Sequence, residues 1–144
     1  MTGRILLVDD EPAILLTLKA ILEMNGLEVV TAASAGEAKS RLGAETYDLV
    51  ITDLNMEHER AGFDVVRFAR QQGGRPPAVA ILTACPDLGR GWKEWGADRL
   101  LIQPTNTPEL LECVAALLGR QKITISREKE TSIVVKGVPP TSAL

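Results

Sequence analysis

The sequence predicts an α/β protein built on a parallel sheet, with helices covering both faces of the sheet. Two features of the chain lead to this prediction. Short apolar runs alternate with segments of helical period, and the loops between them are short, which is typical of repeated strand–helix–strand units. Two of the apolar runs also end in aspartates, and open α/β sheets place their chemistry at the carboxyl ends of their strands.

The composition indicates one globular domain. The chain has 144 residues, of which 45% are hydrophobic and 24% charged, which suffices for one core but not for two ordinary domains. A net charge of -3 without a clustered basic face argues against direct binding to nucleic acid. No apolar stretch approaches the roughly 18 residues of a membrane span, and no signal-peptide core precedes the first strand. We therefore expect a cytoplasmic protein without a membrane segment.

The chain is predicted to open with a buried strand and a helix. Residues 5–8 form a continuous apolar run, which is typical of a strand buried on both faces, and Asp9 and Asp10 follow it. Pro12 fits the first turn of a helix, whose apolar residues recur at helical spacing. Asn25 and Gly26 are expected to end this helix with a left-handed cap.

A second strand, a second helix and the central strand follow. Residues 27–31 alternate and are rich in β-branched side chains, which predicts the second strand. Ser34 and Glu37 have the spacing of a capping box, so a helix begins there and stops near Gly43. The apolar run at 49–52 then ends in Asp53, and we take it as the central strand.

The next segment is predicted to be a loop, a helix and the fourth strand. Residues 57–61 are polar and without period, which indicates a loop on the same edge as Asp53. A third helix is expected from Phe63 to Gly73. The apolar run at 78–82 is the fourth strand, and it ends in Thr83.

The last third of the chain contains its weakest helical segment. Residues 86–96 are interrupted by glycines but carry Trp92 and Trp95, so we predict a poor helix there. Residues 98–102 form a fifth strand that ends at Gln103. The final helix begins after the cap Thr107, with an apolar face of Leu110, Leu111, Val114, Leu117 and Leu118.

Five strands alternating with five helices predict a flavodoxin-like, doubly wound five-stranded parallel sheet with the strand order 2-1-3-4-5. We assign this domain to residues 1–120. Residues 121–144 depart from the pattern, because 122–125 and 132–135 alternate like two short strands and 138–142 are rich in proline. We expect a short C-terminal tail or a weak hairpin there.

In that strand order the first and third strands are neighbours, so Asp9, Asp10 and Asp53 should meet at one edge of the sheet. Three adjacent carboxylates repel one another unless one is protonated or a cation lies among them. Carboxylate and carbonyl oxygens suit magnesium, and an aspartate can also act as a nucleophile that forms an aspartyl-phosphate. The plainer alternative is that Asp9 and Asp10 cap the first helix and Asp53 merely ends a strand.

With these features the chain resembles a known family, the receiver domains of two-component response regulators, over roughly residues 4–119. The segment 5–11 (ILLVDDE) is similar to the opening strand and acidic pair of the family. Residues 53–56 (DLNM) resemble its phosphoacceptor segment, and Thr83, thirty residues beyond Asp53, resembles its switch hydroxyl.

The resemblance implies a role for each of these residues. Asp53 would be the phosphoacceptor and, with Asp10, would ligate Mg²⁺ through its side chain. Asp9 would act through a metal-bound water, and Asn55 would offer its backbone carbonyl. Thr83 would bond a phosphoryl oxygen. The implied partner is a histidine kinase or a phosphotransfer protein.

The chain also departs from the family at three points. The family normally has a lysine before the proline that ends the fifth strand, and this chain has Gln103. An aromatic residue is usual three positions earlier, where Leu100 stands. The loop after Met56 lacks the usual proline and is one residue longer before Gly62. We expect the phosphorylation site to be kept and conformational switching to be weakened.

The remaining features add less. His58, in the loop beside Asp53, could act as a base, but an exposed loop histidine is usually structural. Trp92 and Trp95, with the last strand and helix, could contact an output partner or a second copy in a homodimer, or could pack in the core. Cys85 and Cys113 lack the spacing of a metal or redox site, which indicates ordinary thiols.

Three functional hypotheses result. The first is a signalling receiver, which is not an enzyme beyond catalysing its own phosphorylation and dephosphorylation. The alternative is a phosphorylation-independent pseudo-receiver that acts as a docking module. A magnesium-dependent phosphohydrolase is third, because such enzymes usually place a second carboxylate two residues after the nucleophile, where this chain has Asn55.

Overall fold

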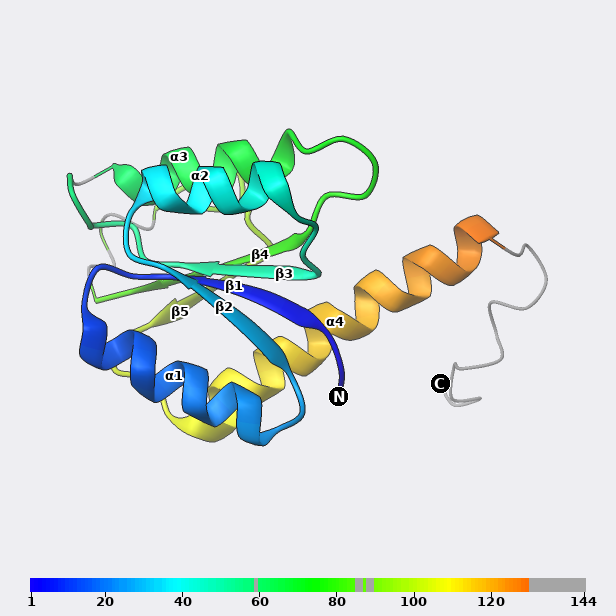
Figure 1. The fold of residues 1–144 in the computed structure, drawn as a ribbon, viewed down its shortest axis with the longest axis horizontal. Coiled ribbons are helices and arrows are strands. Elements are labelled where there is room, and N and C mark those ends of the chain that lie inside the picture. Colours follow the sequence, from blue (N-terminus) through cyan, green and yellow to red (C-terminus); the bar gives the residue numbers. More distant parts are fainter. Residues whose placement is uncertain (59, 85–86, 88–89, 130–144) are drawn as a thin grey trace.

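The computed structural model describes residues 1–58, 60–84, 87 and 90–129, and the side chains up to residue 119. Its centre is a parallel five-stranded sheet with the order β2-β1-β3-β4-β5, which confirms the predicted strand order (Figure 1). The strands are β1 (Arg4–Val8), β2 (Glu28–Ala32), β3 (Leu49–Thr52), β4 (Ala78–Thr83) and β5 (Arg99–Ile102). The helices are α1 (Pro12–Met24), α2 (Ala35–Ala44), α3 (Ala61–Arg70) and α4 (Thr107–Lys129).

Helices cover both faces of the sheet. α2 and α3 lie on one face, and α1 and α4 lie on the other (Figure 1). Because side chains alternate along a strand, Leu6 and Val8 of β1 belong to the core under α2 and α3, whereas Ile5 and Leu7 belong to the core under α1 and α4. β3 and β4 are buried along their whole length. This two-sided burial explains why their sequences are continuous apolar runs.

The poor helix predicted for residues 86–96 does not form in the described part of that segment, residues 87 and 90–96. The prediction is therefore wrong for these residues. Residues 90–96 form turns instead. Gly91 and Gly96 have φ angles of +78° and +96°, in the left-handed region that interrupts a helix. Cys85, Pro86, Leu88 and Gly89 lie outside the described residues.

The last helix is longer than predicted. α4 continues to Lys129, so residues 122–125 are helical and the strand predicted there is wrong. Neither glycine nor proline occurs between Gly119 and Lys129, and an existing helix propagates at little cost once its first turns are formed. Figure 1 shows the end of α4 projecting beyond the sheet. The second predicted strand, at 132–135, and the proline-rich end lie outside the described residues.

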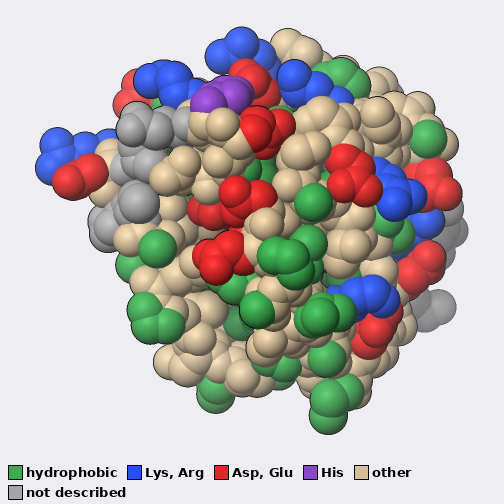
Figure 2. Space-filling view, turned by 60° about the vertical axis from the view of Figure 1, so that its left-hand side comes forward, with side chains coloured by type: hydrophobic (Ala, Val, Ile, Leu, Met, Phe, Trp, Pro, Cys, Tyr) green, Lys and Arg blue, Asp and Glu red, His purple; other side chains and the backbone are tan. Residues whose placement is uncertain are grey.

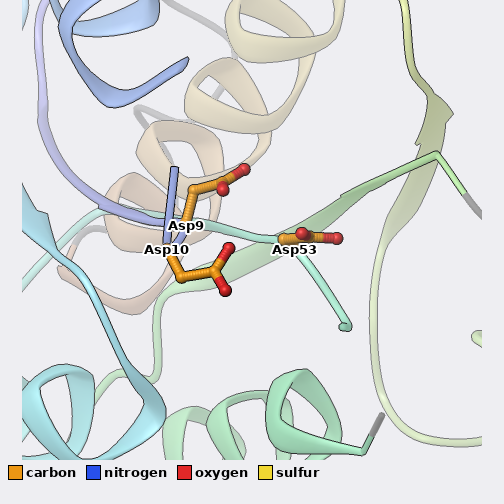
Figure 3. Close-up of side chains that lie close together, drawn as sticks. All are labelled: Asp9, Asp10 and Asp53. Atoms are coloured by element: carbon orange, nitrogen blue, oxygen red, sulfur yellow. The ribbon is translucent and has the colours of Figure 1, made fainter. Parts of the chain in front are cut away.

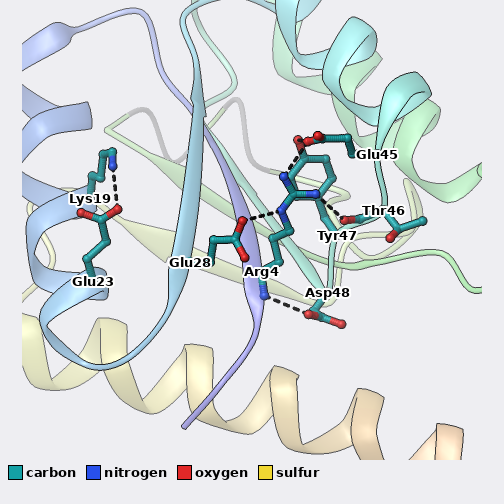
Figure 4. Close-up of polar contacts among 8 residues, drawn as sticks. All are labelled: Arg4, Lys19, Glu23, Glu28, Glu45, Thr46, Tyr47 and Asp48. Atoms are coloured by element: carbon teal, nitrogen blue, oxygen red, sulfur yellow. Dashed lines mark hydrogen bonds and ion pairs between the residues drawn. The ribbon is translucent and has the colours of Figure 1, made fainter.

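Charged side chains join the strands at the edge opposite their carboxyl ends (Figure 4). The Arg4 guanidinium contacts Glu28 Oε2 of β2 at 3.0 Å and Glu45 Oε1, between α2 and β3, at 2.6 Å. Its carbon Cζ also lies 5.0 Å from the centre of the Tyr47 ring. The backbone N–H of Arg4 donates to Asp48 Oδ2 at 2.8 Å. These contacts hold the starts of β1, β2 and β3 together and leave the other edge for the site.

No helix in the described part of the chain is long and apolar enough to cross a membrane.

Candidate functional site

The predicted acidic cluster forms at the carboxyl ends of β1 and β3. Val8 pairs with Thr52 in the sheet, and Asp53 N–H donates to the Val8 carbonyl at 3.0 Å, so the residues after these two strands are neighbours. One carboxylate oxygen from each of Asp9, Asp10 and Asp53 lies within 4.8 Å of the other two (Figure 3).

The three aspartates differ in exposure. Asp9 is 2% exposed, Asp53 is half-buried and Asp10 is exposed. Figure 2 turns this edge of the sheet toward the viewer and shows acidic side chains near the middle of the face, with hydrophobic side chains below them. The cluster is therefore open to solvent on one side and backed by the core on the other.

Backbone N–H groups fix two of the carboxylates. Glu11 N–H donates to Asp9 Oδ1 at 2.9 Å, and Leu54 N–H donates to Asp53 Oδ1 at 2.7 Å. The first bond means that Asp9 also orders the turn that leads into α1, but it reaches the N-cap residue and not an amide inside the helix, so Asp9 does not cap α1. Glu11, at the N-cap of α1, makes no side-chain capping bond.

Burial and mutual repulsion make these carboxyl groups harder to ionise. Burial, followed by the charges of Asp53 and Asp10, raises the pKa of Asp9 to about 6, against a bond from Glu11 N–H that lowers it. The pKa of Asp53 is also raised by burial and by the charges of Asp10 and Glu11, although N–H groups of Leu54 and Asn55 oppose this. A cation at the cluster would relieve both effects. Three hard oxygen donors at this spacing fit a magnesium ion.

The first turn of α3 is held tightly against Asp53 and Leu54 by Gly62. Gly62 N–H donates to the Leu54 carbonyl at 2.9 Å. A Cβ atom on Gly62 would lie 2.2 Å from the Asp53 carbonyl oxygen and 2.5 Å from Leu54 Cα, closer than Cβ atoms approach other atoms. Only glycine fits this contact. The sequence predicted a loop that ends just before Gly62, whereas Gly62 lies in the first turn of α3, and the presence of a glycine there gives no information about a close approach of this kind.

Thr83 and Gln103 lie on the same edge of the sheet. Thr83 ends β4 and is fully buried, and Gln103 N–H donates to its carbonyl at 2.8 Å. Gln103 follows β5 and helps line a groove of about 510 Å³ beside α1. The structure thus brings both residues to the predicted edge.

The two tryptophans and Leu100 pack against the core beneath α2 and α3 and remain partly buried. The ring centres of Phe63 and Trp95 are 3.8 Å apart in an edge-on arrangement. Core packing therefore explains the partial burial of each tryptophan side chain. Contact of these side chains with a partner protein stays a prediction. Cys113 is buried, and burial raises the pKa of its thiol, as expected for an ordinary core cysteine.

His58, the single histidine of the chain, lies in the segment between β3 and α3. Its Nδ1 accepts a bond from Arg60 N–H at 3.2 Å, and its Nε2 lies 3.9 Å from Asp64 Oδ2 of α3. Both ring nitrogens thus have partners in the loop and in α3. These contacts favour a structural role over that of a base.

The comparisons with known proteins agree on one family. Residues 5–115 match the response regulator receiver domain. The curated relative AlgB of Pseudomonas aeruginosa, an alginate biosynthesis transcriptional regulatory protein, is 36% identical over 128 residues, which cover 88% of this chain and 28% of that protein. PrrA of Mycobacterium tuberculosis, a transcriptional regulatory protein, is 33% identical over 133 residues, which cover 91% of this chain and 56% of PrrA. The chain therefore spans less than two thirds of the length of these relatives.

Solved structures give the same result. A response regulator receiver domain protein from Clostridium thermocellum superposes with a TM-score of 0.75 at 31% identity, over 85% of this chain and 98% of that one. TrrA from Thermotoga maritima, a response regulator protein crystallised in complex with Mg(2+)-BeF, superposes with a TM-score of 0.71 at 35% identity, over 79% of this chain and 97% of that one.

Proposed function

Because this chain belongs to the response regulator receiver domain family, we propose that it accepts a phosphoryl group on Asp53 from a histidine kinase or phosphotransfer protein and signals by binding another protein. The observation that carries this proposal is the convergence of Asp9, Asp10 and Asp53 within 4.8 Å. The three carboxylates lie together although they repel one another, and a bound cation would relieve that repulsion.

In the proposed reaction the nucleophile is a carboxylate oxygen of Asp53. It forms a new bond to phosphorus while the bond between phosphorus and the imidazole nitrogen of the partner breaks, and the electron pair of that bond stays on the imidazole. The bond from Leu54 N–H to Asp53 Oδ1 supports this role, because it fixes the orientation of the carboxylate. Magnesium, when bound, neutralises charge on the phosphoryl oxygens.

We assign the magnesium ligands as the side chains of Asp10 and Asp53 and the backbone carbonyl of Asn55, with Asp9 acting through a bound water. The exposure of Asp10 and Asn55 supports the assignment, since both face solvent from which a hydrated ion arrives. The relative TrrA was crystallised in complex with Mg(2+)-BeF, which is consistent with a metal at this site in the family.

Thr83 and Gln103 would respond to the phosphoryl group, Thr83 through its hydroxyl. We propose that Gln103 stands where the family has its lysine, because it follows β5 directly and is bonded to the end of β4. The output partner would bind near Trp92, Trp95 and the face of β5 and α4, where Ile102 is 40% exposed. The same face could pair two copies of the chain.

A second candidate is a pseudo-receiver that docks a partner without being phosphorylated. The observation that favours it is the chemistry of Gln103 and Leu100, which supply neither the cation nor the aromatic ring that the family uses to sense the phosphoryl group.

The test is incubation with acetyl phosphate and magnesium, followed by phosphate-affinity electrophoresis. We expect a retarded band that hydroxylamine removes, that EDTA prevents and that the Asp53→Asn variant lacks. A retarded band in Asp53→Asn would refute Asp53 as the acceptor. An unretarded protein, with a known receiver shifted in parallel, would favour the docking module.

A further inference from the structure

The loop between β3 and α3 is bonded to a third element, α2. Glu57 lies in this loop, and its Oε1 and Oε2 lie 3.2 and 3.1 Å from the N–H of Ala35, the first residue of α2. The two residues are 22 positions apart in sequence, so this bond bridges separate segments of the chain.

α2 has a specific need for an acceptor at this point. The first N–H groups of a helix have no partner within the helix. Within α2 itself, Ser34 Oγ accepts from Glu37 N–H at 3.1 Å, and Glu37 Oε1 accepts in return from Ala33 N–H at 2.7 Å. This capping box leaves Ala35 N–H for an acceptor from elsewhere, and the carboxylate of Glu57 also suits the positive end of the helix dipole.

The bond between Ala35 N–H and the Glu57 carboxylate also constrains the segment that follows Asp53. Leu54 and Met56 are buried and point their side chains into the core, whereas Asn55 between them is exposed. Met56 N–H donates to the His58 carbonyl at 3.2 Å, which closes a turn around Glu57. Glu57 therefore bonds this turn to α2. It does so two residues after Asn55, whose backbone carbonyl is the assigned ligand.

We propose that Glu57 is a positioning residue for magnesium: by bonding to the first turn of α2 it holds the β3–α3 loop so that the Asn55 carbonyl is kept in place as a ligand. The inference rests on the proposed function, since it assumes that the acidic cluster binds the ion. It assigns to Glu57 no contact with the metal or with the phosphoryl group.

The experiment is a calorimetric titration of the whole chain with MgCl₂, compared among four proteins. Glu57→Ala removes the bond, and Glu57→Gln keeps an oxygen that can accept it but removes the charge. Glu37→Ala is the matched control, because it removes one carboxylate, its bond from Ala33 N–H and its ion pair with Arg41 from the same end of α2 without touching the loop. Circular dichroism shows that each variant is folded.

We expect Glu57→Ala to bind magnesium on the order of tenfold more weakly, the scale found when a group that orients a metal ligand is lost. Glu57→Gln should recover most of the affinity, and Glu37→Ala should bind like the unaltered protein. The Ala35 amide resonance, followed by NMR, should move strongly in Glu57→Ala and less in Glu57→Gln.

Four results would overturn the inference. Unchanged affinity in Glu57→Ala would show that the loop needs no such bond, and the proposed function would stand. Equal losses of magnesium affinity in Glu57→Ala and Glu57→Gln would show that the negative charge, and not the bond to Ala35 N–H, supports magnesium binding. A loss of the same size in Glu37→Ala would show the same. An unaltered protein that binds no magnesium would overturn both the inference and the metal-dependent function on which it rests.

Discussion

Gln103 follows β5 on the same edge as Asp53 and offers an amide where, in the proposed correspondence, receiver domains offer an ammonium group. An amide can still donate a hydrogen bond to a phosphoryl oxygen, but it brings no charge. A hydrogen bond to a charged group contributes roughly 1.5–3 kcal/mol, so losing part of it removes about one to two powers of ten from the active-to-inactive ratio. Leu100, packed on the core, also lacks a ring that could change position.

The first prediction is that the unaltered protein responds weakly to a phosphoryl analogue and that Gln103→Lys responds strongly. The measurement is the change in NMR chemical shifts across residues 90–118 when magnesium and beryllofluoride are added to each protein. Shifts in the unaltered protein as large as those in Gln103→Lys would show that the glutamine transmits the signal unaided.

The second prediction concerns the contact of Gly62 with Asp53. A methyl group at Gly62 would meet backbone atoms, which cannot rotate away, so Gly62→Ala should destabilise the domain by at least about 2 kcal/mol and weaken magnesium binding. Gly43 is the control, because it lies in α2 with no atom within 4 Å of the added carbon. Gly43→Ala should be neutral or stabilising, since alanine favours a helix.

Urea unfolding of both variants measures these effects. A Gly62→Ala protein as stable as Gly43→Ala would mean that the β3–α3 loop yields easily, and the tight placement of Asp53 would have to come from elsewhere.

α4 combines a packed first half with an extension beyond the sheet. Leu110, Val114, Leu117 and Leu118 are buried against the sheet. The segment from 120 to 129 continues the same helix past the sheet edge (Figure 1). The first half of α4 therefore supplies the buried side chains that cover β3 and β4.

The third prediction is that a chain ending at Arg120 folds with little loss of stability, below about 1 kcal/mol, because the side chains of α4 that the structure shows buried against the sheet precede that point. Leu117→Ala is the comparison, and it should cost roughly 2–5 kcal/mol as a buried leucine. Thermal and urea unfolding of both proteins are the measurements. A truncation cost above about 3 kcal/mol would make the extension an integral part of the fold.

The stability of the whole domain should depend on the acidic cluster. In the folded protein the pKa of Asp9 is about 6, whereas in the unfolded chain Asp9 has its ordinary pKa of 3.8. The folded state thus binds more protons between these values, so stability increases as the pH falls and is lost as the pH rises through 6. Asp53, whose pKa is also raised, acts in the same direction.

The fourth prediction is that, in EDTA, lowering the pH from 7 to 5 stabilises the domain by about 1 kcal/mol, as these two pKa values of Asp9 require. Magnesium should raise the melting temperature more at pH 7 than at pH 5, because protons compete with the ion. Asp9→Asn should flatten the pH dependence. A melting temperature that falls on acidification from pH 7 to 5 in EDTA would contradict the raised pKa that burial and the neighbouring charges give Asp9.

The sequence alone determined the sheet, its strand order and the meeting of Asp9, Asp10 and Asp53, because continuous apolar runs, helix caps and short loops are local features and the crossover rules then leave one natural topology. It also determined that Thr83 and Gln103 lie on the same edge, since Thr83 ends β4 and Gln103 directly follows β5.

Only the tertiary structure decided the rest. The turns at 90–96 and the helical course of residues 122–125 depend on backbone conformation and on continuation of a packed helix, which outweigh a weak local pattern. The close approach of Gly62 to Asp53 and the bond from Ala35 to Glu57 join residues distant in sequence. Contacts of this kind depend on how loops meet in three dimensions, and no periodicity of a single chain encodes them.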